Sequence, residues 1–433
     1  MNARARAVSL LLSLAEREGF ANLSLSDAVL DEAGKDAPFL TALFYGAVER
    51  RLTLDYVARA LSARGEEDLA PHTRALLHVG LYQLYFMRIP PHAAVSETVA
   101  LAKNKGEAAF VNAVLRRAAE TPLPMPPEGR LARYLSVKES FPLPTVRRFL
   151  ALFGEEETRA LLAAFNETAP LSLTVDVTRI TPEALGARFT AAGYAWERGR
   201  YSPVTLKVTS PVSPTALPGF DEGLFLVQDE ASAIAALALA PRAGDRIVDV
   251  CAAPGGKSMT AAILADKRSE SYAFDLHESK LSLIRETAAR LSVPLRVGAL
   301  DATVGDAAFD GTADRVICDV PCSGLGVLGK KADLRYRPLG EALAPLGYEI
   351  LCRAARYVKE GGVLVYSTCT LLPEENQENV NRFLAENRSF VTEDFAVGDL
   401  KSEGGSLTLL PHKHGTDGFF VCRLRRKTQI CLV

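Results

Sequence analysis

Short β-rich runs alternate with helical stretches from Gln228 onward, and this alternation constrains the fold of the chain more than any other feature. Six runs are predicted to be strands: 246–250, 271–274, 295–297, 316–318, 362–365 and 419–424. Helical stretches separate most of them. Strands and helices that alternate in this way form a parallel sheet with helices packed on both of its faces. We therefore predict a doubly wound α/β domain over residues 228–427.

The first half of the chain has a different organisation. Residues 1–125 carry apolar side chains at helical spacing and no β-rich run, so we expect an all-α domain there. A proline-rich stretch at 121–127 cannot continue a helix and marks a domain boundary. Residues 126–227 begin with helix and continue as a small α+β module. Its expected elements are strands at 171–175, 204–208 and 224–227 and a helix at 182–192.

Composition and charge exclude several classes of protein. The chain has 433 residues and an apolar fraction of 48%, enough for two or three cores, without an apolar run of about 18 residues that would span a membrane. Its seven cysteines lack paired Cys-x-x-Cys spacing, so we expect neither a disulfide framework nor a metal site. With a net charge of −2, the chain would bind nucleic acid only through local basic patches. These properties favour a cytoplasmic protein.

A glycine-rich loop follows the first predicted strand of the α/β domain. It reads Asp249-Val-Cys-Ala-Ala-Pro-Gly-Gly-Lys-Ser258 and opens a helix. Glycine lets the backbone approach a ligand closely, and a helix start offers unpaired N–H groups. The end of this loop is similar to a nucleoside-triphosphate loop, but position 251, where that motif has its first glycine, is cysteine. We therefore expect a different cofactor.

Two acidic residues follow the next two strands. Asp275, about twenty residues beyond the loop, is suited to bind the two hydroxyls of a ribose. Asp301 follows the third strand and is able to accept a hydrogen bond from an adenine amine. An aspartate at a strand end is equally often only a helix cap. Ribose and adenine contacts beside a loop without a phosphate motif indicate S-adenosylmethionine rather than a dinucleotide.

Two cysteines follow two further strands of the same sheet. Cys322 lies in Asp319-Val-Pro-Cys-Ser323, and Cys369 lies in Ser367-Thr-Cys-Thr370, which is followed by Pro373-Glu-Glu-Asn376. Loops at the carboxyl ends of parallel strands form the ligand crevice of such a sheet. We therefore expect both thiols to face one substrate. This arrangement favours covalent chemistry over packing.

The order of these motifs resembles that of the RNA (cytosine-5)-methyltransferases, most closely the bacterial RsmB/Fmu/Sun type that modifies 16S ribosomal RNA. The likeness runs over nearly the whole chain. Residues 96–103 and 110–117 are similar to that family's NusB-like helical domain, 227–232 to the entry of its catalytic domain, and 415–421 to its last hairpin.

The resemblance implies a fold and a set of roles. It implies a NusB-like helical domain over 1–125, a middle module over 126–227 and a Rossmann-like methyltransferase domain over 228–427. Cys369 would be the nucleophile, and Cys322 would assist product release. S-adenosylmethionine would be held by Cys251, Ala252, Ala253, Pro254, Gly255, Gly256, Lys257, Asp275, Asp301 and Asp319.

The chemistry of cytosine explains why two thiols suit this reaction. Carbon 5 is too electron-poor to take a methyl group directly, and a thiolate added at carbon 6 makes it nucleophilic. A free cysteine is only a few per cent thiolate at pH 7, so Cys369 needs local activation. Asp319 is expected to donate to the ring or orient it as charge develops. Cys322, or a water that it positions, is the candidate base for the proton at carbon 5.

The target base must leave its stack, which favours a cytosine in a single-stranded loop of folded RNA. Phosphate contacts are expected from basic residues after the Cys322 loop and from a pair in the helical domain. These are Lys330, Lys331, Arg335, Arg337, Arg116 and Arg117. The chain departs from the family pattern at Leu325 and at Gly329-Lys-Lys-Ala332, where a small polar residue and an Arg-Arg-His-Pro stretch are usual. Target contacts are expected to differ there.

Three alternatives stay open. A tRNA cytosine-5 methyltransferase would keep the chemistry and change the target. A non-catalytic RNA-binding assembly or antitermination factor is suggested by the NusB-like half, although such a binder would not need both Cys322 and Cys369. DNA cytosine methylation would be expected to use a Pro-Cys nucleophile without a Thr-Cys-Thr partner. We expect a monomer that acts on 16S rRNA, either naked or in a partly assembled small subunit.

Overall fold

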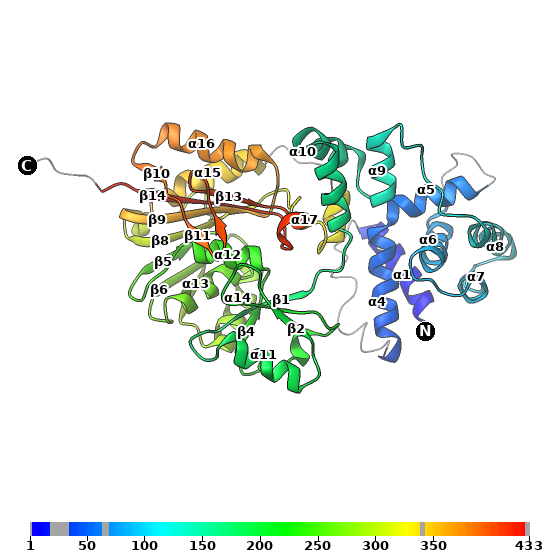
Figure 1. The fold of residues 1–433 in the computed structure, drawn as a ribbon, viewed down its shortest axis with the longest axis horizontal. Helices are drawn as coiled ribbons and strands as arrows, with labels where there is room; N and C mark the ends of the chain where they lie inside the picture. Colours follow the sequence, from blue (N-terminus) through cyan, green and yellow to red (C-terminus); the bar gives the residue numbers. More distant parts are fainter. Residues whose placement is uncertain (1, 18–33, 63–68, 338–342, 429–433) are drawn as a thin grey trace, which may run out of the picture. The chain divides into compact units, whose positions relative to one another are not determined.

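The computed structural model describes residues 2–17, 34–62, 69–337 and 343–428, which form two compact units (Figure 1). The first unit contains the described residues up to Glu167 together with 328–337. The second contains the remaining described residues. The sequence suggests domain boundaries near 125 and 227, which divide the chain into three parts that are smaller than these two units. Those boundaries stay predictions.

The first unit is built from helices, as the apolar spacing predicts, and its described residues contain no strand. The helices are α1 (Ala3–Arg17), α4 (Ala37–Glu49), α5 (Arg51–Leu61), α6 (Pro71–Tyr85), α7 (Pro91–Val99), α8 (Lys105–Glu120), α9 (Leu131–Glu139) and α10 (Leu143–Ala164). Apolar side chains at helical spacing, among them Phe44, Leu76 and Val111, are fully buried in a shared core. Helix α8 ends one residue before the proline-rich stretch, because proline cannot donate the next backbone hydrogen bond.

One segment of the first unit comes from far along the chain. Residues 328–337, which follow the Cys322 loop, include the short 3₁₀ helix η4 (Ala332–Tyr336) and contact α4. The sequence predicts an exposed RNA-binding loop at this point. In the structure, part of this segment is instead buried in the helical unit.

The second unit begins with a four-stranded antiparallel sheet in the order β2-β3-β1-β4. Its strands are β1 (Leu171–Val175), β2 (Trp196–Arg198), β3 (Thr205–Val208) and β4 (Phe225–Val227), and α11 (Pro182–Ala191) packs on them. The three predicted strands and the helix are confirmed. Strand β2 was not predicted, because a three-residue edge strand with one apolar side chain carries no periodic signal.

The larger sheet of this unit contains all six strands predicted from the sequence. Its order is β10-β14-β9-β8-β5-β6-β7, and β13 also pairs with β14. The strands are β5 (Arg246–Asp249), β6 (Glu270–Asp275), β7 (Leu295–Ala299), β8 (Ala313–Asp319), β9 (Val358–Thr368), β10 (Phe390–Thr392), β13 (Ser406–Leu409) and β14 (Phe419–Arg426).

The sheet is mixed, so the expectation of a fully parallel sheet is wrong at one edge. Strands β5 to β9 run parallel, whereas β14 runs antiparallel to both β9 and β10. The connection before β14 explains its pairing with β13. Residues 410–418 join β13 to β14 and hold only the one-turn helix α17 (Pro411–His414), which is too short for the crossover that a parallel pair requires, so these two strands form an antiparallel hairpin. The pairing of β14 with β9 joins segments that are far apart in the chain.

Helices cover both faces of the larger sheet (Figure 1). On one side lie α12 (Glu230–Ala238), α13 (Gly256–Leu264) and α14 (Glu278–Leu291), and on the other lie α15 (Leu343–Ala355) and α16 (Gln377–Glu386). Because β5 to β9 are parallel, their carboxyl ends share one edge, and the loops that carry the predicted cofactor-binding and catalytic residues all leave from it. None of the described helices is long and apolar enough to cross a membrane.

Candidate active site

The loop between β5 and α13 is held by a buried aspartate. Asp249 accepts a 2.5 Å hydrogen bond from the Ser258 hydroxyl and a 3.3 Å bond from the Cys251 amide. Burial raises the pKa of Asp249 to about 7, against the opposing effect of the Ser258 hydrogen bond. Gly255 precedes α13 with φ of +103°, a conformation that favours glycine. Asp249 therefore shapes the loop from within.

Two carboxylates lie at the ends of the neighbouring strands β6 and β7. Asp275 is buried, and its oxygens accept hydrogen bonds of 3.1 Å from the amides of Ala253 and His277. Asp301 is exposed, and its Oδ1 atom accepts bonds from the Thr303 hydroxyl at 2.6 Å and the Thr303 amide at 2.9 Å, which lower the pKa of Asp301. A carboxylate has about four lone-pair sites, so both retain acceptor capacity for a ligand.

Negative charge gathers around Cys251. Burial raises the pKa of this thiol well above its ordinary value, and the charges of Asp249, Asp319, Asp275 and Asp301 raise it further. An acidic surrounding disfavours a polyphosphate and suits a cation. The acceptors match the hydroxyls and amine of an adenosine, and the charge matches a sulfonium. The residues present therefore fit S-adenosylmethionine.

Lys257 joins this loop to the strand that leads to Cys322. Its ammonium lies 2.7 Å from Asp319 Oδ2 and 5.0 Å from the centroid of the Phe419 ring, and its side chain is 13% exposed. Burial alone would lower the pKa of Lys257, but the charge and hydrogen bond of Asp319, with a contribution from Cys369, hold the pKa above its ordinary value. Lys257 is thus a largely buried cation that is paired with Asp319.

The structure brings the two predicted site thiols together. Cys322 and Cys369 follow the neighbouring strands β8 and β9, and their sulfur atoms lie 3.3 Å apart. Both are half-buried. The hydrogen bond with Cys369, and then burial, raise the pKa of Cys322 well above its ordinary value. Cys322 therefore keeps its proton, and it is the donor of this contact whenever Cys369 is a thiolate.

Two glycines let three chain segments meet at the backbone of Cys369. The Gly326 amide donates to the Cys369 carbonyl at 2.9 Å, and the Gly418 amide donates to the Gly326 carbonyl at 2.8 Å. A Cβ atom on Gly326 would overlap the carbonyl oxygen of Gly418. No residue larger than glycine fits at position 326 without moving one of these segments.

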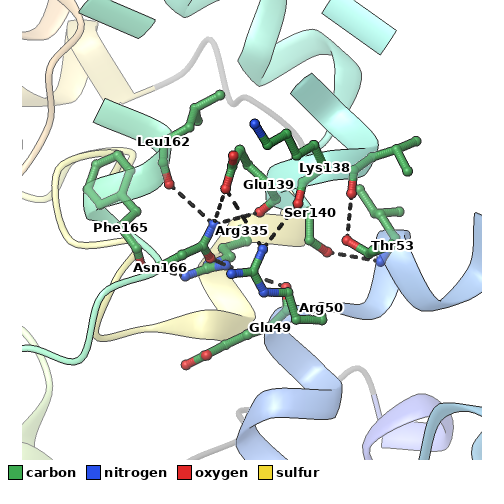
Figure 2. A network of polar contacts seen from close by, with 12 residues as sticks. Glu49, Arg50, Thr53, Lys138, Glu139, Ser140, Leu162, Phe165, Asn166 and Arg335 are labelled. Carbon is green, nitrogen blue, oxygen red and sulfur yellow. Dashed lines mark hydrogen bonds and ion pairs between the residues drawn. The ribbon is translucent and has the colours of Figure 1, made fainter. Parts of the chain in front are cut away.

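The prediction that Arg335 contacts RNA is wrong. Arg335 is 1% exposed, and its guanidinium donates within the first unit to the Phe165 carbonyl and the Asn166 side chain at 2.7 Å and to the Leu328 carbonyl at 2.9 Å (Figure 2). It also lies 4.5 Å from the centroid of the Phe141 ring. A guanidinium whose donors are used in this way does not also bind a phosphate. Arg335 instead fixes the 328–337 segment.

The other five predicted RNA contacts are exposed. They are Lys330, Lys331 and Arg337 on the 328–337 segment and Arg116 and Arg117 on α8. Arg117 also donates a 2.6 Å hydrogen bond to the Leu61 carbonyl. Their contact with RNA stays a prediction. The sequence grouped Arg335 with its neighbours because a charge pattern does not reveal which side chain points inward.

Several residues beside the site were not assigned to it from the sequence. Asp249 supports the cofactor loop, and Ser323, Glu375 and Asn376 contact the loops of the two thiols. Glu375 and Asn376 belong to the Pro-Glu-Glu-Asn run that follows Cys369. Their place in that run, shortly after the thiol, was the only signal that the sequence offered.

Three family models match successive parts of the chain. Residues 1–120 match the NusB family, 141–215 match the ferredoxin-like domain of RsmF/B-like methyltransferases, and 236–425 match the 16S rRNA methyltransferase RsmB/F. These matches agree with the helical unit, the four-stranded sheet module and the larger mixed sheet described above.

Solved structures share the fold. A methyltransferase homolog of Pyrococcus horikoshii is 26% identical, covers 67% of this chain and 97% of its own, and superposes with a TM-score of 0.58. A second crystal structure is 25% identical and superposes with a TM-score of 0.80 over 98% of both chains.

Curated relatives match over nearly their whole length. A probable ribosomal RNA small subunit methyltransferase B of Synechocystis is 33% identical and covers 98% of this chain and 100% of its own. The corresponding protein of Bacillus subtilis is 32% identical over 97% of this chain and 98% of its own. From these full-length matches and the order of its three parts, the chain belongs to the RsmB/F family of 16S rRNA methyltransferases.

Proposed function

We propose that the chain methylates carbon 5 of one cytosine in 16S rRNA through a covalent bond between Cys369 and carbon 6 of that base. The observation that carries the proposal is the pair of thiols, 3.3 Å apart at the ends of β8 and β9. Methylation of a ring nitrogen or an amine needs no nucleophilic cysteine, whereas methylation of carbon 5 does. The names of the relatives support small-subunit ribosomal RNA as the substrate.

S-adenosylmethionine is the methyl donor of this family and supplies an electrophilic methyl group when it is bound. In this proposal the backbone of residues 251–257 would hold it, with Asp275 at the ribose hydroxyls and Asp301 at the adenine amine. Asp319 would contact the donor or the cytosine ring. The acceptor capacity that both strand-end carboxylates retain supports these roles.

The first chemical step belongs to Cys369. Its thiolate adds to carbon 6 of cytosine, and the displaced electron pair makes carbon 5 nucleophilic toward the methyl group. The protonated ammonium of Lys257 and the S–H donor of Cys322 both lie close to Cys369. A neighbouring cation and a hydrogen-bond donor are the groups that activate a cysteine as a thiolate. Asp319, held by Lys257, would orient the ring.

The second step belongs to Cys322. Once carbon 5 carries the methyl group, its proton must leave, the carbon 5–carbon 6 double bond must reform, and the electron pair of the carbon 6–sulfur bond must return to Cys369. The hydrogen bond to Cys369 is the largest cause of the raised pKa of Cys322. When Cys369 is bonded to the base, that cause is removed. Cys322 must first release its own proton to solvent, and its thiolate, or a water that Cys322 positions, then takes the carbon-5 proton.

Labelled methyl transfer tests the proposal. Purified enzyme and labelled S-adenosylmethionine are incubated with 16S rRNA, tRNA or DNA, and the product is mapped by bisulfite sequencing. We expect incorporation at one cytosine of 16S rRNA. Incorporation into tRNA alone would change the target to the tRNA alternative. Incorporation into DNA alone would favour the DNA alternative, and a lack of transfer to all three nucleic acids would leave only an RNA-binding assembly factor.

Cysteine variants separate the two thiols. Cys369→Ala should lose both product and covalent adduct, whereas Cys322→Ala should accumulate a protein–RNA adduct that survives denaturant. Cys352→Ala, in α15, serves as the matched control and should behave as wild type. If Cys369→Ala forms the adduct and Cys322→Ala does not, the two roles are reversed. Parallel assays on naked 16S rRNA and on partly assembled small subunits identify the natural substrate.

A further inference from the structure

Glu375 is a buried carboxylate that touches both thiol loops, and the chemistry proposed above gives it no role. It is 3% exposed. Its oxygens lie 3.1 and 3.2 Å from the Ser323 amide, and Oε2 accepts a 2.7 Å bond from the Ser323 hydroxyl. That hydroxyl lies 2.6 Å from the hydroxyl of Thr370. Because Ser323 follows Cys322 and Thr370 follows Cys369, one carboxylate reaches both loops.

The donor and the acceptor of each of these hydrogen bonds follow from the number of protons that each group can donate. A hydroxyl has one proton to donate, and an ionised carboxylate has none. Ser323 uses its proton on Glu375, so the Thr370 hydroxyl must donate to Ser323. The series of hydrogen bonds therefore runs from Thr370 through Ser323 to Glu375. Glu375 is the terminal acceptor, and it holds the Cys322 loop directly and the Cys369 loop only through Ser323.

The next residue, Asn376, holds the Cys369 loop directly. Its Oδ1 atom accepts a 2.6 Å hydrogen bond from the Thr368 hydroxyl, and its Nδ2 atom donates a 3.0 Å bond to the Thr370 carbonyl. These two partners flank Cys369. Thr368, Thr370 and Asn376 are all buried, so water does not compete for the bonds.

The backbone that carries these two residues is anchored to the sheet. The Tyr366 hydroxyl, on β9, donates a 2.6 Å bond to the Glu375 carbonyl, and the Asn379 side chain donates to the same hydroxyl at 3.3 Å. Tyr366 is fully buried. Glu375 and Asn376 therefore start from a fixed point on the strand that leads to Cys369.

We propose that Glu375 and Asn376 are positioning residues with separate tasks: Glu375 holds Cys322 for release of the product, and Asn376 holds Cys369 for attack on the base. This inference rests on the proposed two-thiol mechanism and adds two residues to it. Adjacent positions in the chain then control successive steps, because their side chains reach different loops.

Adduct measurements test the division of tasks. Glu375→Gln keeps the shape but removes one acceptor and the charge, so adduct should form at the wild-type rate and its release should slow by about 10- to 100-fold, as for an ångström-scale misplacement. Asn376→Asp keeps an acceptor for Thr368 but loses the donor to Thr370. It should slow adduct formation by a similar factor without accumulating adduct. Glu378→Gln, an exposed glutamate at the start of α16, is the matched control and should leave both rates unchanged.

A double variant tests whether Glu375 acts through Ser323. Ser323→Ala removes the hydroxyl that links Glu375 to Thr370 and should itself slow release of the adduct. If Glu375→Gln fails to fold, Ser323→Ala replaces it as the test of release. If Glu375 works through Ser323, Ser323→Ala combined with Glu375→Gln should slow release little more than either change alone. Melting temperature and affinity for S-adenosylmethionine verify the fold of each variant.

The outcomes separate this inference from the proposed function. If Cys322→Ala traps no adduct, the two-thiol mechanism itself fails. If Cys322→Ala traps adduct but Glu375→Gln and Asn376→Asp lower adduct formation equally, the mechanism stands and the division of tasks is overturned. Additive effects of Ser323→Ala and Glu375→Gln would also overturn the route through Ser323.

Discussion

Replacing Arg335 with methionine should release the 328–337 segment from the helical unit. Methionine keeps an unbranched stem that contacts the Phe141 ring but removes every donor. The carbonyls of Phe165 and Leu328 and the amide oxygen of Asn166 then lose hydrogen bonds of 2.7–2.9 Å, and the Glu49 carbonyl loses a longer one of 3.4 Å (Figure 2). Because Arg335 is 1% exposed, water does not replace these donors unless the segment moves.

The expected cost follows from the balance of two effects. A hydrogen bond to a charged group contributes about 1.5–3 kcal/mol, so the three short bonds are worth at most about 5–9 kcal/mol. Desolvation of the buried guanidinium offsets several kcal/mol of that gain. Arg335→Met leaves three neutral buried acceptors without a donor, at about 1–3 kcal/mol each, so we expect a loss of about 3–5 kcal/mol after partial relaxation of the segment.

Limited proteolysis with trypsin measures this loss at Lys330 and Lys331. Cleavage there follows the population of the opened segment, so a loss of about 3–5 kcal/mol should raise the rate by a factor of about 100 to 1,000 or more. Arg335→Lys keeps the positive charge but lacks the planar guanidinium, so its cleavage rate should lie between those of wild type and Arg335→Met. Arg337→Met, at an exposed position of the same segment, is the control. Cleavage rates within threefold of each other in Arg335→Met and Arg337→Met would refute the reasoning.

Three further changes have defined outcomes. Burial raises the pKa of Asp249 from 3.8 to about 7. Between these pH values the folded state holds a proton that the unfolded state has released, so stability falls as pH rises. The free energy of unfolding should therefore fall by about 2–3 kcal/mol more between pH 5 and pH 8 in wild type than in Asp249→Asn. Gly418→Ala should displace Gly326 and the Cys369 carbonyl, and slow methyl transfer about 100-fold while calorimetry finds affinity for S-adenosylmethionine unchanged. Lys330→Ala should lower the salt slope of RNA binding by about 1, and bisulfite mapping should find the same target cytosine.

Six strands of the larger sheet could be predicted because their signal is local, whereas the short strands β10 and β13 were missed. Each is a short β-rich run between helical stretches, and such runs can be read without knowledge of their neighbours. The direction of β14 could not be read in the same way. Periodicity shows that residues 419–426 form a strand, but its antiparallel pairing with β9 joins segments that are far apart in the chain, and no local pattern reveals it.

The same distinction separates the site residues that were predicted from those that were not. Asp275, Asp301, Cys322 and Cys369 each follow a predicted strand, and a parallel sheet gathers such positions at one edge whatever the rest of the fold. Glu375 owes its place to three contacts with Ser323, which lies 52 positions earlier in the chain. No local pattern marks such a residue.

Arg335 shows why a cluster of charges is a weak predictor of an interface. Lys330, Lys331 and Arg337 lie on the exposed side of the 328–337 segment, whereas Arg335 points into the helical unit. The four are indistinguishable by charge, and η4 decides which of them is buried. The planar fork of arginine makes it the residue best able to satisfy several carbonyls at once, so an arginine in a basic cluster is also the member most readily recruited to the interior.

The two thiols are unequal before any substrate binds, and this inequality favours one assignment of roles. The pKa of Cys322 is raised by the hydrogen bond with Cys369 and by burial, and the charge of Glu375 raises it further. Cys369 instead has the ammonium of Lys257 among its neighbours. Of a pair that shares one proton, the member beside the cation releases it, and the member beside the carboxylate keeps it. The thiolate that can attack is therefore Cys369.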